Sequence, residues 1–273
     1  MQFNSNYHRW GIYHSILFHR QVPRLPSERA FNIHSLGSEV LTNLYHEVNS
    51  LIPQIRIETV PSQKGNKMRE ESPASTTGLP LGIPTIQFAE SLNRKNRIEA
   101  IAHELLHLLL VYRHGLGVVG RKIPLYGNGD DVFRYFMSMS GDWEYLFGQL
   151  ANTLHHIILV DYLKGNYGIE SSLHLRLLHH NFGMIAKNSP HDKESLYAKG
   201  MIAFEYERLI GNVDRLSNFD RQTDFFRKSY QAAQEHFGKY SFQTIPAPSV
   251  YKEDVLSFLE DLSYQKQDFL FCP

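Results

Sequence analysis

The chain has 273 residues, 42% hydrophobic and 21% charged, a composition typical of a globular protein with a substantial core. Lys plus Arg and Asp plus Glu number 28 each, so no net charge favours nucleic acid or an acidic membrane as partner. One cysteine, Cys272, excludes a disulfide framework and indicates a reducing compartment. The N-terminal stretch lacks the pattern of a signal peptide and no apolar run is long enough to span a membrane, so we expect a cytoplasmic protein.

The first third of the chain predicts a helix and two strands. Residues 35–52 have apolar side chains near helical spacing, and residues 54–60 alternate loosely as in a strand. Residues 61–80 show no apolar period and predict a loop. Ile83–Phe88 is a β-branched and aromatic run that predicts a second strand, and Pro84 favours a position at the sheet edge.

The remaining chain is predominantly helical in pattern. A helix capped by Ser91 should end near His114-Gly115, where glycine provides the exit. Further helices are predicted at 142–165, 170–187, 192–210, 218–237 and 250–266. These elements indicate an α+β fold, with an N-terminal α/β lobe over 1–140 and a helical lobe over 141–273 integrated into one domain.

The most informative stretch is the apolar run Ile98–Tyr112, which carries His103, Glu104 and His107. A buried carboxylate is costly unless it is paired, so this helix requires a partner that its own sequence lacks. Residues four apart share one helix face, so both imidazoles can bind one metal ion beside Glu104. Two histidines holding Zn²⁺ with an open position lower the pKa of a bound water, and the adjacent carboxylate can take its proton. Two core histidines that are hydrogen-bonded elsewhere are the structural alternative.

The sequence HELLH, preceded by strands and followed by helices, resembles the zincin metallopeptidases. The metzincin branch would need glycine at 110 and histidine at 113, where this chain has Leu110 and Arg113. The gluzincin branch implies a glutamate on a later helix as third ligand, and Glu144 is the best match, although the residues before it depart from the branch's NExxSD pattern. The resemblance also implies that substrate binds in extended form along the strand at Ile83–Phe88.

Other polar residues of the 142–165 helix compete for a place in the site. His155 and His156 are alternatives to Glu144 as ligand, as is Asp161, and Glu144 itself could be an ordinary first-turn carboxylate. The resemblance offers Asn152, His155 and His156 a role in stabilising an oxyanion, although they could simply hydrogen-bond one another. A further histidine group is predicted on a solvated face: His174, His179 and His180.

The resemblance implies a zinc-dependent metallopeptidase acting on a peptide or protein, with Glu104 as general base, His103, His107 and Glu144 as ligands and Zn²⁺ as cofactor. A catalytically inactive zincin-fold protein that binds or regulates a partner is the alternative, because motif and fold do not guarantee turnover. A ferritin-like di-iron site is rejected, since Glu104-x-x-His107 is the only E-x-x-H in the sequence and such sites need two.

Overall fold

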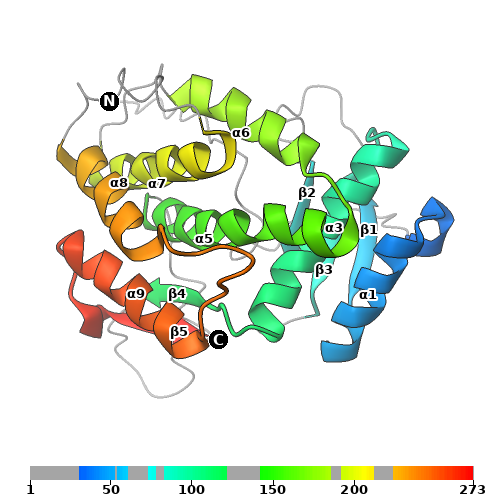
Figure 1. Ribbon diagram of the computed structural model, residues 1–273, viewed down its shortest axis with the longest axis horizontal. Coiled ribbons are helices and arrows are strands. Elements are labelled where there is room, and N and C mark those ends of the chain that lie inside the picture. The colour runs from blue at the N-terminus through cyan, green and yellow to red at the C-terminus, as the bar shows by residue number, and fades with distance from the viewer. Residues whose placement is uncertain are drawn as a thin grey trace, which may run out of the picture.

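The structure is a computed structural model and describes residues 31–52, 54–60, 73–77, 83–121, 142–185, 192–211 and 224–272. Over these ranges the chain is a mixed α+β protein, with seven helices, one three-stranded sheet and one two-stranded sheet (Figure 1). The predicted α+β class, with a small sheet and a mostly helical second half, is confirmed. The predicted division into two lobes stays a prediction.

Strand β3 (Thr85–Ala89) is the centre of the three-stranded sheet. It pairs in parallel with β1 (Arg56–Val60) and antiparallel with β2 (Ala74–Thr77). The prediction that this strand lies at an edge and pairs with a peptide is therefore wrong. Pro84 precedes the strand, and its carbonyl oxygen accepts a 2.9 Å hydrogen bond from the Arg56 backbone N–H, so its missing N–H interrupts no ladder.

Strand β2 occupies part of the segment for which the sequence predicts a loop. Its four residues, ASTT, contain no apolar alternation that would mark a strand. Among the described residues β3 is the strand paired with it, so β2 forms an edge of this sheet. The rest of the predicted loop, 61–72 and 78–80, lies outside the described residues.

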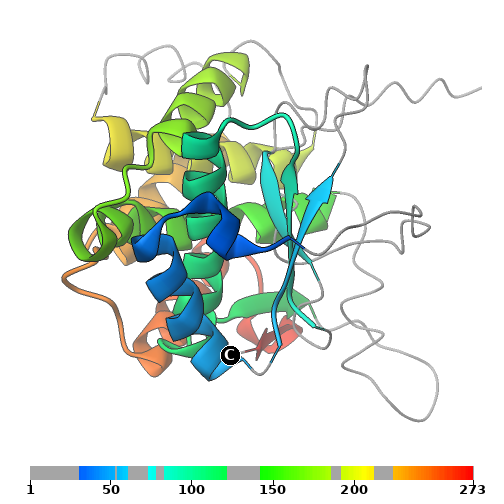
Figure 2. The same ribbon diagram turned by 90° about the vertical axis from the view of Figure 1, so that its right-hand side faces the viewer.

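Helix α3 (Arg94–Tyr112) packs on one face of the sheet, with α1 (Glu39–Leu51) beside it (Figure 2). Asn93 begins α3, and its side chain accepts a 2.9 Å hydrogen bond from the Asn96 backbone N–H. The predicted cap, Ser91, is therefore wrong by two residues. Nearly all of α3 from its second turn onward is buried, as the apolar run requires.

The second half of the chain builds a helical layer against α3. Helix α5 (Asp142–Tyr167) contacts both α3 and α7 (Lys193–Ile210), so it lies between these two helices (Figure 1). The predicted helices are confirmed within a few residues, except that 218–223 lies outside the described residues. Their bounds are α5 (Asp142–Tyr167), α6 (Ser172–Ile185), α7 (Lys193–Ile210), α8 (Asp224–Phe237) and α9 (Pro248–Asp261).

A second sheet, not predicted from the sequence, pairs β4 (Val118–Arg121) antiparallel with β5 (Phe269–Cys272). Two 3₁₀ turns complete the described elements: η1 (Ile33–Leu36) and η3 (Lys266–Asp268). One apolar core cluster includes residues from both halves of the chain. None of the described helices has the length and apolar character needed to cross a membrane.

The exit of α3 depends on a glycine, as predicted. Gly115 has φ +63°, a left-handed conformation that side chains rarely adopt. A Cβ built there would also lie 2.7 Å from Cγ of Pro248 at the start of α9. The turn after α3 and the first turn of α9 therefore meet closely.

Candidate metal centre

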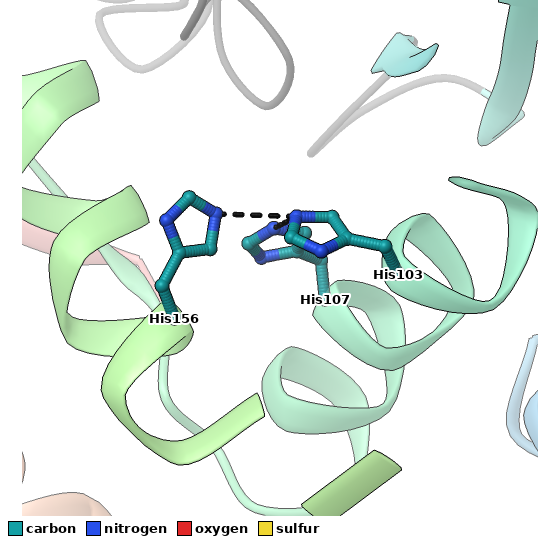
Figure 3. Close-up of side chains that lie close together, drawn as sticks. All are labelled: His103, His107 and His156. Carbon is teal, nitrogen blue, oxygen red and sulfur yellow. Dashed lines mark hydrogen bonds between the residues drawn. The ribbon is translucent and has the colours of Figure 1, made fainter. Parts of the chain in front are cut away.

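Three histidines from two helices converge on one point. His103 and His107 lie one turn apart on α3, and His156 faces them from α5 (Figure 3). The Nε2 atom of His103 is 3.2 Å from Nε2 of His156 and 3.1 Å from Nε2 of His107. His107 and His156 are buried and His103 is nearly so.

These separations match a metal coordination shell. Zinc binds imidazole nitrogens at about 2.0–2.1 Å, so two nitrogens of a tetrahedral site lie about 3.3–3.4 Å apart. The observed distances of 3.1 and 3.2 Å are within a few tenths of an ångström of this value. The ligand atoms of all three histidines lie within 4.8 Å of one another, so the set can hold one ion and leave a fourth tetrahedral position open.

The hydrogen bonds of His107 fix which of its nitrogens carries the proton. Nε2 of His155 lies 2.9 Å from the Leu116 carbonyl oxygen, which can only accept, so His155 carries its hydrogen on Nε2. Nδ1 of His155 then accepts from Nδ1 of His107, 3.0 Å away. His107 is consequently left with a lone pair on Nε2, the atom that faces His103 and His156.

A second chain of contacts orients His156. Its Nδ1 donates a 2.8 Å hydrogen bond to Oε1 of Glu205 on α7, so its Nε2 also carries a lone pair. In these tautomers the Nε2 lone pairs of His107 and His156 both face Nε2 of His103. A single hydrogen on His103 Nε2 cannot form a well-aligned hydrogen bond to both of them. A cation between the three nitrogens resolves this conflict, so the donor set fits a zinc ion.

Burial keeps these imidazoles neutral, as metal ligands must be. It lowers the pKa of His103 and His107 well below 6.5, and the neighbouring imidazoles lower it further. Burial also lowers the pKa of His155 and His156 to about 4, against the opposing hydrogen bonds to Leu116 and Glu205. At neutral pH no proton competes strongly for the nitrogen lone pairs.

Glu104 lies on α3 beside these ligands and is directed to the edge strand. It is 3% exposed, and its Oε2 accepts a 2.8 Å hydrogen bond from the Thr76 hydroxyl of β2. Burial raises the pKa of Glu104 to about 7, although the hydrogen bonds from Thr76 oppose the rise. A carboxylate with a pKa near neutrality can both accept and return a proton at physiological pH.

Glu205 is the most enclosed carboxylate of the site. It is fully buried; Oε1 lies 3.4 Å from His174 Nε2 as well as near His156, and Oε2 accepts a 2.9 Å hydrogen bond from the Thr153 hydroxyl. The Gln149 amide also approaches Oε2, at 3.3 Å. Burial alone would raise the pKa of Glu205, but His156 and His174 outweigh it and hold the pKa at about 2.

The predicted site residues are only partly brought together. His103, Glu104 and His107 are grouped as predicted, with His156 facing them, and His155 lies behind His107 rather than at the centre. Asn152 is buried on α5 one turn before His156. Glu144 belongs to the first turn of α5, but its side chain lies outside the described part of the chain, so its role as ligand stays a prediction.

Two residues of the site were missed by the sequence analysis. His174, expected on a solvated face, has a side chain only 10% exposed, and its ring centroid is 4.2 Å from that of His156. Its neighbours His179 and His180 are exposed, as predicted. Glu205 could have been found from its position in the apolar run MIAFEYE, by the reasoning that drew attention to Glu104.

Comparisons of the chain with protein-family models, with curated proteins and with solved structures find no match. The geometry of the site is therefore the basis for assigning a function to the protein.

Proposed function

We propose that the protein is a zinc-dependent metallopeptidase of the zincin type, in which His103, His107 and His156 hold the metal ion and Glu104 is the general base. The observation that carries the proposal is the convergence of three Nε2 atoms from α3 and α5 beside a buried carboxylate. A histidine as third ligand departs from the gluzincin pattern favoured by the sequence, in which Glu144 has that place.

Each residue has a separate task in this proposal. A zinc ion bound by three neutral histidines would supply a Lewis acid that polarises a carbonyl and acidifies water. Glu104, with its pKa raised to about 7, would accept a proton from the water that attacks the carbonyl carbon and deliver it to the amine released when the C–N bond breaks. Thr76 holds the Glu104 carboxylate in place through its hydroxyl. These tasks together make up metal-assisted hydrolysis of an amide bond.

Metal analysis tests the ligand set. The purified protein should hold about one zinc per chain, and His103→Ala or His156→Ala should remove it, whereas exposed His180→Ala should not. Retention of zinc by His156→Ala together with its loss in Glu144→Gln would transfer the third position to Glu144.

Cleavage of a peptide library tests the activity. Glu104→Gln should keep zinc and fold but lose hydrolysis by about 10²–10⁴-fold or more, because an amide cannot accept the proton. Exposed Glu90→Gln is the matched control and should cleave as wild type does. Equal cleavage by wild type and Glu104→Gln would point to a contaminating protease. No cleavage by the zinc-loaded wild type would favour a binding or regulatory protein instead.

A further inference from the structure

We propose that Glu205 is a positioning residue of this centre, which fixes the tautomer and orientation of His156 and supplies negative charge behind the metal ion. The inference rests on the proposed metal site. It assigns a role to a side chain on α7, a third helix that contributes no ligand, and it makes α7 part of the metal-binding machinery.

Within the described part of the chain, no lysine or arginine is given as an ion-pair partner of the Glu205 carboxylate. It is fully buried, and the ion-pair partners that the structure gives it among the described residues are two histidines, His156 and His174. An imidazole that binds a metal ion through Nε2 and donates its Nδ1 hydrogen to a carboxylate is neutral, so His156 brings no positive charge to Glu205. A buried carboxylate next to a neutral imidazole keeps its full negative charge, and such a charge is costly without a compensating cation nearby.

A metal ion bound on the far side of His156 is that cation. Three neutral imidazoles bring no negative charge to a divalent ion, so the surrounding shell has to supply it. The Nδ1–H of His156 donates to Glu205 at 2.8 Å while its Nε2 faces His103, so the imidazole lies between the carboxylate and the ion. A carboxylate in this position makes the imidazole a stronger donor and stops the ring from turning.

Glu205 is itself held in place by the helix that carries the ligand. Gln149, Thr153 and His156 occur at helical spacing on α5, and all three donate to the Glu205 carboxylate. Gln149 also donates a 2.9 Å hydrogen bond to the Thr153 hydroxyl. One face of α5 therefore holds the Glu205 carboxylate by hydrogen bonds and also carries His156, the ligand that this carboxylate orients.

The same atoms raise a competing interpretation. His156, His174 and Glu205 have ligand atoms within 4.8 Å of one another, close enough to hold a second metal ion. With the first ion also bound, the second would require His156 to lose its remaining N–H hydrogen, on Nδ1, and to bridge the two metals as an imidazolate. The 2.8 Å separation of Nδ1 and Oε1 is that of a direct hydrogen bond to a charged acceptor, which favours the positioning role.

Zinc affinity of the full-length chain tests the inference, measured by competition with a chromophoric chelator. Glu205→Gln should raise the zinc Kd by about 10–100-fold, the usual effect of losing such a partner, and should alter the absorption spectrum of the cobalt-substituted protein. Glu207→Gln is the matched control on the same helix: Glu207 bonds to Tyr230, away from the histidines, and its loss should leave both readings unchanged. Thermal melting of the metal-free variants separates lost affinity from lost fold.

Thr153→Val provides a second, milder test if Glu205→Gln does not fold. It removes one hydrogen bond to Glu205 and should weaken zinc binding by about fivefold. Wild-type affinity in folded Glu205→Gln, or in Thr153→Val where only that variant folds, would overturn the positioning role. Two zinc ions per wild-type chain, falling to one in His174→Ala, would replace it with the second metal site. A wild-type chain that binds no zinc would overturn the proposed function itself, and this inference with it.

Discussion

The hydroxyl of Thr76 on β2 donates a 2.8 Å hydrogen bond to Oε2 of Glu104 on α3, which joins the edge of the sheet to the centre of the HExxH motif. Both side chains are almost fully buried, at 1% and 3% exposed. The bond therefore acts in a low-dielectric environment, where losing one partner leaves the other without compensation.

Replacing Thr76 by valine keeps the volume of the side chain and removes this donor. We expect the metal-free protein to lose about 1–3 kcal/mol of unfolding free energy at pH 8, because the ionised Glu104 stays buried without its hydrogen bond. Urea unfolding measures the loss. The control is Ser75→Ala, on the opposite face of the same strand, which should change stability by less than about 0.5 kcal/mol. Equal losses in the two variants would contradict the special role of the Thr76 hydroxyl.

Glu104 should make the metal-free protein less stable as pH rises. Burial raises its pKa from 4.5 to about 7, so between these values the folded state binds more protons than the unfolded state. The contribution of Glu104 to stability is complete below about pH 4.5 and is lost as pH rises to about 7. Glu104→Gln does not titrate at this position. Its free energy of unfolding should therefore exceed that of wild type by up to about 3 kcal/mol at pH 8 and show no gain at pH 4.5. Chelator-treated samples at both pH values test this, and a gain that is the same at both would contradict it.

The buried histidines act in the opposite direction. His155 and His156 have pKa values lowered to about 4, so between pH 6.5 and 4 the unfolded state takes up protons that the folded state does not. Stability should fall as pH drops through this window, by up to about 1.4 kcal/mol per pH unit for each histidine. The measurement is best made on metal-free Glu104→Gln, in which the opposing carboxylate is absent. A flat stability curve from pH 7 to 5 would show that these imidazoles are not held neutral.

Glu99 should contribute strongly to stability, because this residue of α3 caps the N-terminus of α6. Its carboxylate accepts hydrogen bonds from the Ser172 hydroxyl and from the backbone N–H groups of Leu173 and His174, at the N-terminus of α6. Glu99→Gln keeps the shape of the side chain but weakens its interaction with these donors and with the dipole of α6. The variant should lose about 1–2 kcal/mol of unfolding free energy. Exposed Glu170→Gln, which breaks only a surface ion pair with Lys164, should cost less than about 0.5 kcal/mol. Thermal unfolding of the two variants compares them directly.

Local patterns predicted the parts of the site that lie on one helix. The HExxH spacing placed His103, Glu104 and His107 together because residues four apart on a helix share a face. A sequence pattern could not decide whether His155 or His156 is the ligand on α5. It shows which residues share a face of that helix, but not which face is turned to α3. The structure shows that Thr153 and His156 are among the side chains of α5 that reach Glu205 on α7.

The sheet was predicted less well, for a different physical reason. Thr76 lies in a four-residue strand without apolar alternation, and it pairs because β3 offers it a free edge. Pro84 suggested an edge for β3, but a proline just outside a strand removes no ladder donor. Strands β4 and β5 likewise depend on each other, although they lie far apart in the sequence. Such tertiary dependence leaves no local signal.

The pairing of β4 with β5 has a consequence for the order in which the chain folds. Arg121 lies opposite Phe269, so the two strands close a loop of about 150 residues, and this entropy cost must be met before any ladder bond forms. Helices α3 and α5, whose hydrogen bonds are local, carry no such penalty. The ring centroids of Phe147 on α5 and Phe269 on β5 are 5.6 Å apart. Strand β5 therefore packs on a surface that exists only once α5 has formed. The small sheet should therefore form last, and its amide hydrogens should exchange with solvent before those of α3.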